Sequence, residues 1–131
     1  MEKIKKSLLP YLSFHDYPIE SIELLYKEKR LKFFIDGAYL DINNGIFLGK
    51  GTLTFANWES ISMKKYDFRI KKWIQINVAE NMDPLDEICE SSFSKSRVIL
   101  SGFAKNCGLW MEWEITHAKI VAEFEPEPGL D

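Results

Sequence analysis

The sequence is poor in the residues that build disulfide frameworks and metal clusters. It has two cysteines and two histidines among 131 residues, too few for a disulfide-rich scaffold, and free thiols are typical of a reducing compartment. No run approaches the ~20 apolar residues that a membrane helix needs. Before Pro10 only Leu8 and Leu9 form an apolar run, which is too short for a signal peptide. We therefore expect a cytoplasmic protein without a membrane segment.

Glycine and proline are also scarce, with seven and five residues, and this argues against a disordered or low-complexity chain. Hydrophobic residues make up 46% of the sequence and aromatic residues 14%. A chain of this length can then bury one core without the help of a disulfide or a metal. We expect a single domain over 1–131, with an N-terminal arm or short helix at 1–10 and a flexible tail at 126–131.

Alternation of apolar and polar residues recurs along the chain and indicates half-buried strands. The alternating segments are 19–28, 31–36, 38–42, 46–57, 61–78, 109–116 and 120–124. Segment 96–104 is apolar on both faces and is expected to be a central strand. The run Asn43-Asn44-Gly45 predicts a hairpin turn of type I′. The apolar phase shifts at Asp36-Gly37, which predicts a β-bulge there.

One helix is predicted to start at Asp83, because aspartate is a good N-cap and Pro84 suits the first helical position. An apolar stripe with helical spacing follows. Its members are Leu85, Ile88, Cys89 and Phe93. The whole pattern predicts a mainly β (α+β) fold: an antiparallel β-sandwich, or a strongly bent sheet, of about seven strands with one short helix packed beside it.

Charge is distributed unevenly along the chain. Residues 1–74 carry 13 Lys+Arg and 9 Asp+Glu, a net of +4, whereas residues 75–131 carry 4 and 11, a net of −7. An acidic surface repels phosphate and favours a basic partner. We therefore expect a protein partner and no direct binding of nucleic acid. The basic residues of segment 64–72 alternate with apolar ones and are expected to form a solvated face.

The outward face of segment 109–116 is the predicted partner-binding surface. Trp110 alternates there with Glu112 and Glu114, and an exposed indole beside carboxylates is a good anchor for a protein partner. The alternative is that Trp110 belongs to a second core layer. Further partner-binding acids are predicted in segment 80–90. They are Glu80, Asp86, Glu87 and Glu90.

No motif for catalysis is complete. His15 and Asp16 are adjacent, as in metal-dependent phosphohydrolases, but such sites need additional His and Asp ligands. Cys107 with His117 would make a nucleophile and base. Cys89, Cys107, His15 and His117 would supply the ligands of a zinc site, but none of them is paired at the short spacing of a zinc motif. We expect no enzyme, no metal site and no cofactor. Two alternatives remain open: a small enzyme or small-ligand-binding protein with a pocket near His15, Cys107 or His117, and a structural subunit of an assembly.

Three segments carry a resemblance to a known group of proteins. They are 14–24 (FHDYPIESIEL), 51–55 (GTLTF) and 109–115 (LWMEWEI). Together they resemble small bacterial immunity proteins of polymorphic-toxin and contact-dependent growth inhibition systems. The resemblance implies a cytosolic antidote without catalytic residues, which occludes the active site of a cognate toxin. Many toxins of that kind are basic nucleases, and the acidic C-terminal half fits such a partner.

Overall fold

The structure is a computed structural model, and it describes residues 2–78 and 83–126. Within these residues the chain forms thirteen strands, joined in antiparallel sheets, and one short 3₁₀ helix, η1 (Lys6–Tyr11). The mainly β fold predicted from the alternating pattern is therefore confirmed. None of the described helices is long and apolar enough to cross a membrane.

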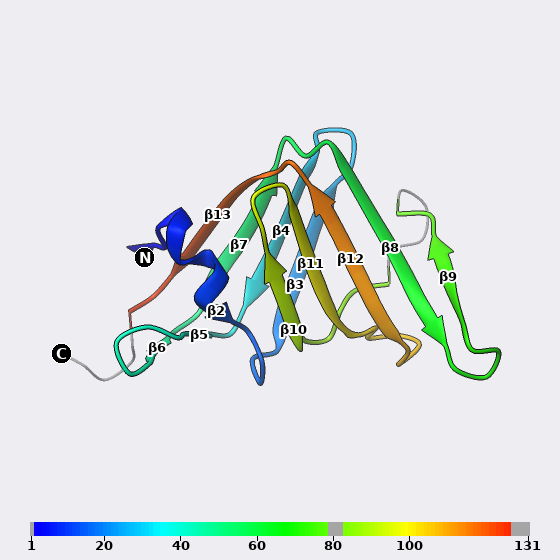
Figure 1. Ribbon diagram of the computed structural model, residues 1–131, viewed down its shortest axis with the longest axis horizontal. Helices are drawn as coiled ribbons and strands as arrows, with labels where there is room; N and C mark the ends of the chain where they lie inside the picture. Colours follow the sequence, from blue (N-terminus) through cyan, green and yellow to red (C-terminus); the bar gives the residue numbers. More distant parts are fainter. Residues whose placement is uncertain (1, 79–82, 127–131) are drawn as a thin grey trace.

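Two five-stranded sheets make up most of the fold (Figure 1). The first sheet has, in spatial order, the strands β1 (Glu2–Lys3), β13 (Lys119–Phe124), β7 (Gly51–Ala56), β4 (Arg30–Ile35) and β3 (Ile19–Leu25). The second sheet has β10 (Glu90–Phe93), β11 (Arg97–Phe103), β12 (Trp110–Thr116), β8 (Ser60–Asp67) and β9 (Lys72–Ile76). A small third sheet joins β2 (Leu12–Ser13), β5 (Ala38–Leu40) and β6 (Ile46–Leu48).

The two large sheets face each other and enclose one continuous core. Figure 1 shows β10, β11 and β12 lying in front of β3, β4 and β7. Phe33 of β4 meets Trp113 of β12 across the interface, with ring centroids 5.4 Å apart, and both residues are fully buried. On β12 the odd positions from Met111 to Ile115 are buried and the even positions are half-exposed, as the alternation predicted. The predicted sandwich is thus the arrangement that the structure has.

Two tight turns carry the chain from one sheet to the other. Asn57 lies between β7 and β8, and His117 lies between β12 and β13, both with positive φ angles (53° and 49°). The amide N–H of Glu59 donates to the Thr116 carbonyl oxygen at 2.9 Å, so the two crossings are bonded together. The inward-facing residues switch between odd and even positions at His117, because the next strand belongs to the opposite sheet.

The predicted helix at Asp83 is wrong. Segment 85–89 is extended and lies between β3 and β11, and residues 90–93 form strand β10. The amide of Asp86 donates to the carbonyl oxygen of Phe103 at 3.0 Å, and that of Cys89 donates to Ser101 at 2.8 Å. A short isolated helix is marginal in water, and these sheet bonds replace its internal bonds. Leu85 and Ile88 are nevertheless buried, so the apolar stripe was a core signal.

The predicted bulge at Asp36-Gly37 is also wrong. β4 ends at Ile35, the chain bends, and β5 begins in the third sheet at Ala38. The apolar phase shifts because the chain changes sheets, and no extra residue is absorbed within one ladder. The hairpin predicted at Asn43-Asn44-Gly45 is present between β5 and β6, and all three residues have positive φ angles.

The ends of the chain differ partly from the predictions. Residues 2–3 pair with β13, and η1 runs through Pro10 to Tyr11 where the predicted helix would have stopped. The described residues form nearly twice the predicted number of strands, because several strands are only two or three residues long. Residues 127–131 of the predicted tail, and Glu80, lie outside the described residues.

Candidate functional site

The outer face of the second sheet, which is the face opposite Trp113, carries a row of aromatic side chains. The antiparallel register aligns Phe103 of β11 with Trp110 of β12, Trp110 with Tyr66 of β8, and Tyr66 with Trp73 of β9. We call these residues the aromatic row. The rings stack in two edge-on pairs, with centroids 5.1 Å apart for Phe103 and Trp110 and 5.3 Å apart for Tyr66 and Trp73.

The aromatic row is open to solvent at both ends. The side chains of Phe103 and Trp73 are 51% and 42% exposed, while Trp110 and Tyr66 are half-buried. The hairpin between β8 and β9 also exposes Phe68, at 60%. Trp110 is therefore an outward residue, as predicted, and not part of a second core layer. Adjacent large apolar side chains on an open face mark an interaction surface more often than scattered ones do.

The acids of this face stand close to basic side chains of the same chain. Glu114 pairs with Arg97 of the neighbouring strand, with 3.4 Å between Oε2 and Nε. Glu112 lies opposite Lys64 in the ladder, and the Lys64 ammonium sits 4.5 Å from the Trp73 ring centroid. The face thus has mixed charge, whereas the sequence had suggested an acidic one.

An aspartate fixes the turn between β8 and β9. The buried carboxylate of Asp67 accepts the backbone N–H of Arg69 at 3.0 Å and its guanidinium at 3.3 Å. The hydrogen bond from the Arg69 side chain, together with the backbone bond, lowers the pKa of Asp67. The ionised aspartate therefore holds the β8–β9 hairpin, and with it the position of Trp73.

The acids predicted in segment 80–90 do not gather on one surface. Glu90 pairs with Ser101, which pairs in turn with Glu112, so Glu90 shares the outer face of the second sheet. Asp86 is exposed beside β3, where its carbonyl oxygen accepts the amide of Ile19 at 3.0 Å. The Glu87 carboxylate instead accepts a hydrogen bond from the N-terminal loop, at the amide of Asp16.

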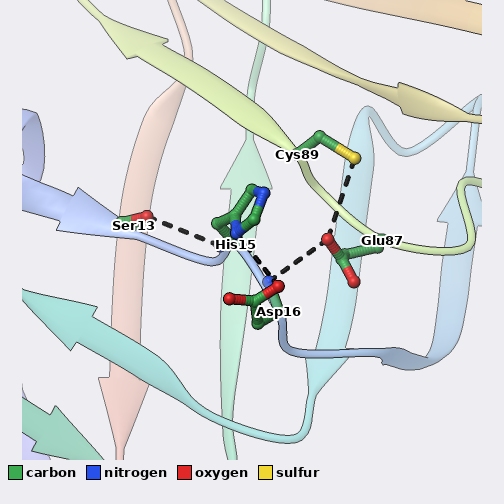
Figure 2. Close-up of polar contacts among 5 residues, drawn as sticks. All are labelled: Ser13, His15, Asp16, Glu87 and Cys89. Carbon is green, nitrogen blue, oxygen red and sulfur yellow. Dashed lines mark hydrogen bonds and ion pairs between the residues drawn. The ribbon is translucent and has the colours of Figure 1, made fainter.

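Glu87 meets His15 and Asp16 in a second cluster (Figure 2). The His15 Nδ1 lies 3.1 Å from Asp16 Oδ1, and the amide of Asp16 donates to Glu87 Oε2 at 3.2 Å. The Cys89 thiol donates to the same Glu87 oxygen at 3.7 Å. We call His15, Asp16 and Glu87 the His15 cluster. Burial and the neighbouring Glu87 carboxylate raise the pKa of Cys89, so this thiol stays protonated.

The other cysteine and histidine do not join this cluster. Cys107 lies in the turn before β12 and His117 follows β12, so the two stand at opposite ends of the strand. A strand of that length spans about 20 Å, which excludes the nucleophile and base pair weighed from the sequence. His117 instead contacts Glu59 at 3.4 Å. A joint zinc site of both histidines and both cysteines is excluded for the same reason.

An open pocket of about 470 Å³ adjoins the His15 cluster. Its lining comes from the N-terminal loop and the third sheet. The lining residues are Ser13, His15, Asp16, Tyr17, Tyr39 and Phe47. The sequence allowed a pocket near His15, Cys107 or His117, and of these three residues only His15 lines this pocket.

Sequence reasoning found Trp110 but missed the other three rings of the aromatic row and the hydrogen bond between Asp16 and Glu87. Each missed ring stands on a different strand, and the register that aligns the strands is not written in any one segment. Comparisons with protein-family models, with curated proteins and with solved structures found no match for this chain.

Proposed function

We propose that this protein is a non-catalytic binding protein that docks a protein partner on the outer face of its second sheet. The observation that carries the proposal is the aromatic row, four rings aligned across four neighbouring strands. Together with the resemblance to immunity proteins, it leads us to propose a cognate toxin domain as the partner, neutralised in the cytoplasm by occlusion.

The row has the properties of a binding anchor. Tryptophan and tyrosine dominate the energetics of protein interfaces, because they bury a large area at a small cost in side-chain entropy. The stacked pairs Phe103–Trp110 and Tyr66–Trp73 already hold each ring in place. A preorganised surface loses little freedom on binding, so more of the contact energy appears as affinity.

The charged groups around the row select the partner. Exposed ion pairs such as Glu114 with Arg97 stabilise a fold by only about 0–1 kcal/mol, so a partner's cation can replace the internal one at small cost. Glu90, Glu112 and Glu114 then offer three carboxylates to a basic toxin surface. Such contacts set the orientation and the rate of association more than the affinity.

The experiment takes the product of the gene adjacent to that of this chain as the candidate toxin. Bacterial cells that express the toxin are expected to grow when they also produce the wild-type chain. The W73A and F103A variants are expected to lose about 30-fold in affinity for the purified toxin, since a hot-spot aromatic contributes about 2 kcal/mol. Cells that produce either variant should therefore grow less well in the presence of the toxin than cells that produce the wild-type chain.

The matched control is F47A. Phe47 is 53% exposed and stacks on Tyr39 at 5.0 Å, but it belongs to the third sheet, away from the row. F47A is expected to protect as well as the wild type. A neighbouring product without toxicity, or W73A and F103A variants that bind it with unchanged affinity, would contradict the proposal.

A further inference from the structure

We propose that the His15 cluster binds a divalent transition-metal ion, with His15, Asp16 and Glu87 as its ligands. The proposal departs from the sequence, which predicted no metal site, and it does not depend on the proposed partner surface. One imidazole and two carboxylates are a donor set suited to zinc or manganese.

The two halves of the cluster are far apart in the sequence and are joined by backbone contacts. Pro18 and Glu87 form an antiparallel bridge, and the amide of Ile19 donates to the Asp86 carbonyl oxygen at 3.0 Å. The amide of Asp16 donates to the Glu87 carboxylate at 3.2 Å. The fold, and not a ligand, therefore brings the donors together. A site held in this way loses little entropy when an ion binds.

The distances between the donors suit a metal ion. One ligand atom from each residue of the cluster lies within 4.8 Å of the other two. Zinc bonds of about 2.0–2.2 Å place tetrahedral ligands about 3.3–3.6 Å apart. Closure thus requires donor shifts of at most about 1.5 Å, which rotation of the exposed His15 and Asp16 side chains provides.

The local charge favours a cation. Among residues 2–78 and 83–126, no lysine or arginine forms an ion pair with Asp16 or Glu87, and the only ion-pair contact of Asp16 is with His15. Two carboxylates this close repel each other, and a bound cation relieves that repulsion. Glu20 and Asp36, by contrast, do have a basic partner. The Lys50 Nζ lies 3.7 Å from Glu20 Oε2 and 4.0 Å from Asp36 Oδ1.

The surroundings complete the site. Cys89 donates its thiol hydrogen to Glu87 Oε2 and so orients that carboxylate, which is the usual role of a group behind a metal ligand. On the other side, His15 and Asp16 open onto the pocket that Tyr39 and Phe47 line. Three protein ligands leave a tetrahedral ion with a fourth position for water or a small ligand from that pocket.

Titration of the full chain with Zn²⁺ tests the proposal, with calorimetry and the thermal unfolding midpoint as readouts. We expect saturable binding of one ion and a rise in the midpoint with zinc concentration. H15A and E87Q should each weaken binding at least tenfold. Urea unfolding of both variants without metal should match the wild type, since the backbone contacts that hold the segment remain.

The matched control is H117A, which removes the other histidine that contacts a glutamate. His117 and Glu59 provide only two donors, so H117A should bind zinc as tightly as the wild type. W73A should also bind zinc normally, which separates this site from the partner surface. Absence of saturable binding at millimolar Zn²⁺, or equal losses for H117A and H15A, would overturn the proposal.

Discussion

Gly102 tests whether the extended path of segment 85–89 is right. This glycine lies on β11, and a Cβ atom added to it would overlap the carbonyl oxygen of Glu87. In G102A either β11 shifts within its packed surroundings or segment 85–89 moves away from it. Overpacking costs about 1–3 kcal/mol. Moving the segment breaks the bonds of Asp86 and Cys89 to β11, at about 0.5–1.5 kcal/mol each. Both routes predict that the free energy of unfolding of G102A is about 1–3 kcal/mol lower than that of the wild type.

Urea unfolding followed by tryptophan fluorescence measures this loss. The matched control is G49A, because a Cβ at Gly49 would lie 3.2 Å from the Cβ of Glu125, and this exposed residue has to give by only a few tenths of an ångström. We expect G49A to stay within about 0.5 kcal/mol of the wild type. A helix over 83–93 would leave Gly102 without this close neighbour. Equal stabilities for G102A and the wild type would therefore refute the extended path.

Two further predictions concern a buried indole and a turn carboxylate. Among the described residues the fully buried Trp113 Nε1 has no hydrogen-bond acceptor. W113F removes this unsatisfied donor, so its free energy of unfolding in urea should fall by less than about 2 kcal/mol, against about 3–5 kcal/mol for W113A. Because its pKa is lowered on folding, ionised Asp67 stabilises the fold above its ordinary pKa of about 3.9, and this contribution is lost as the pH falls through the lowered value. D67N should therefore be less stable than the wild type at pH 7 and approach it in acid, and a constant difference down to the acid limit would contradict this reasoning.

Alternation predicted the faces of the strands well because one face of each sheet is buried. On β12 a shift of one residue would expose Met111 and Trp113 and bury Glu112. The alternation therefore determines which side of this strand faces the core. The hairpin at Asn43-Asn44-Gly45 followed from local chemistry, since these residue types tolerate positive φ angles. Both signals are local, and each can be recognised within one segment.

Register and sheet membership were not predictable in this way. The phase shift at Asp36-Gly37 has the same appearance in the sequence whether the chain bulges or leaves the sheet. The alignment of Trp110 with Tyr66 and Trp73 depends on which strands pair and at which residue. The contact of Asp16 with Glu87 joins positions 71 apart in the sequence, a separation that no spacing rule covers.

The error in secondary structure and the missed cluster have one cause. Leu85 and Ile88 satisfy helical spacing and also serve as core residues of an extended segment, so apolar pattern alone does not separate the two states. The extended segment bonds to Ile19 of β3 on one side and to β11 on the other. It thereby carries Glu87 to His15 and continues into β10, where Glu90 joins the outer face. A helix would have satisfied its own backbone and left Glu87 without this path, so the choice between helix and strand at 83–93 also decides whether the proposed metal site exists.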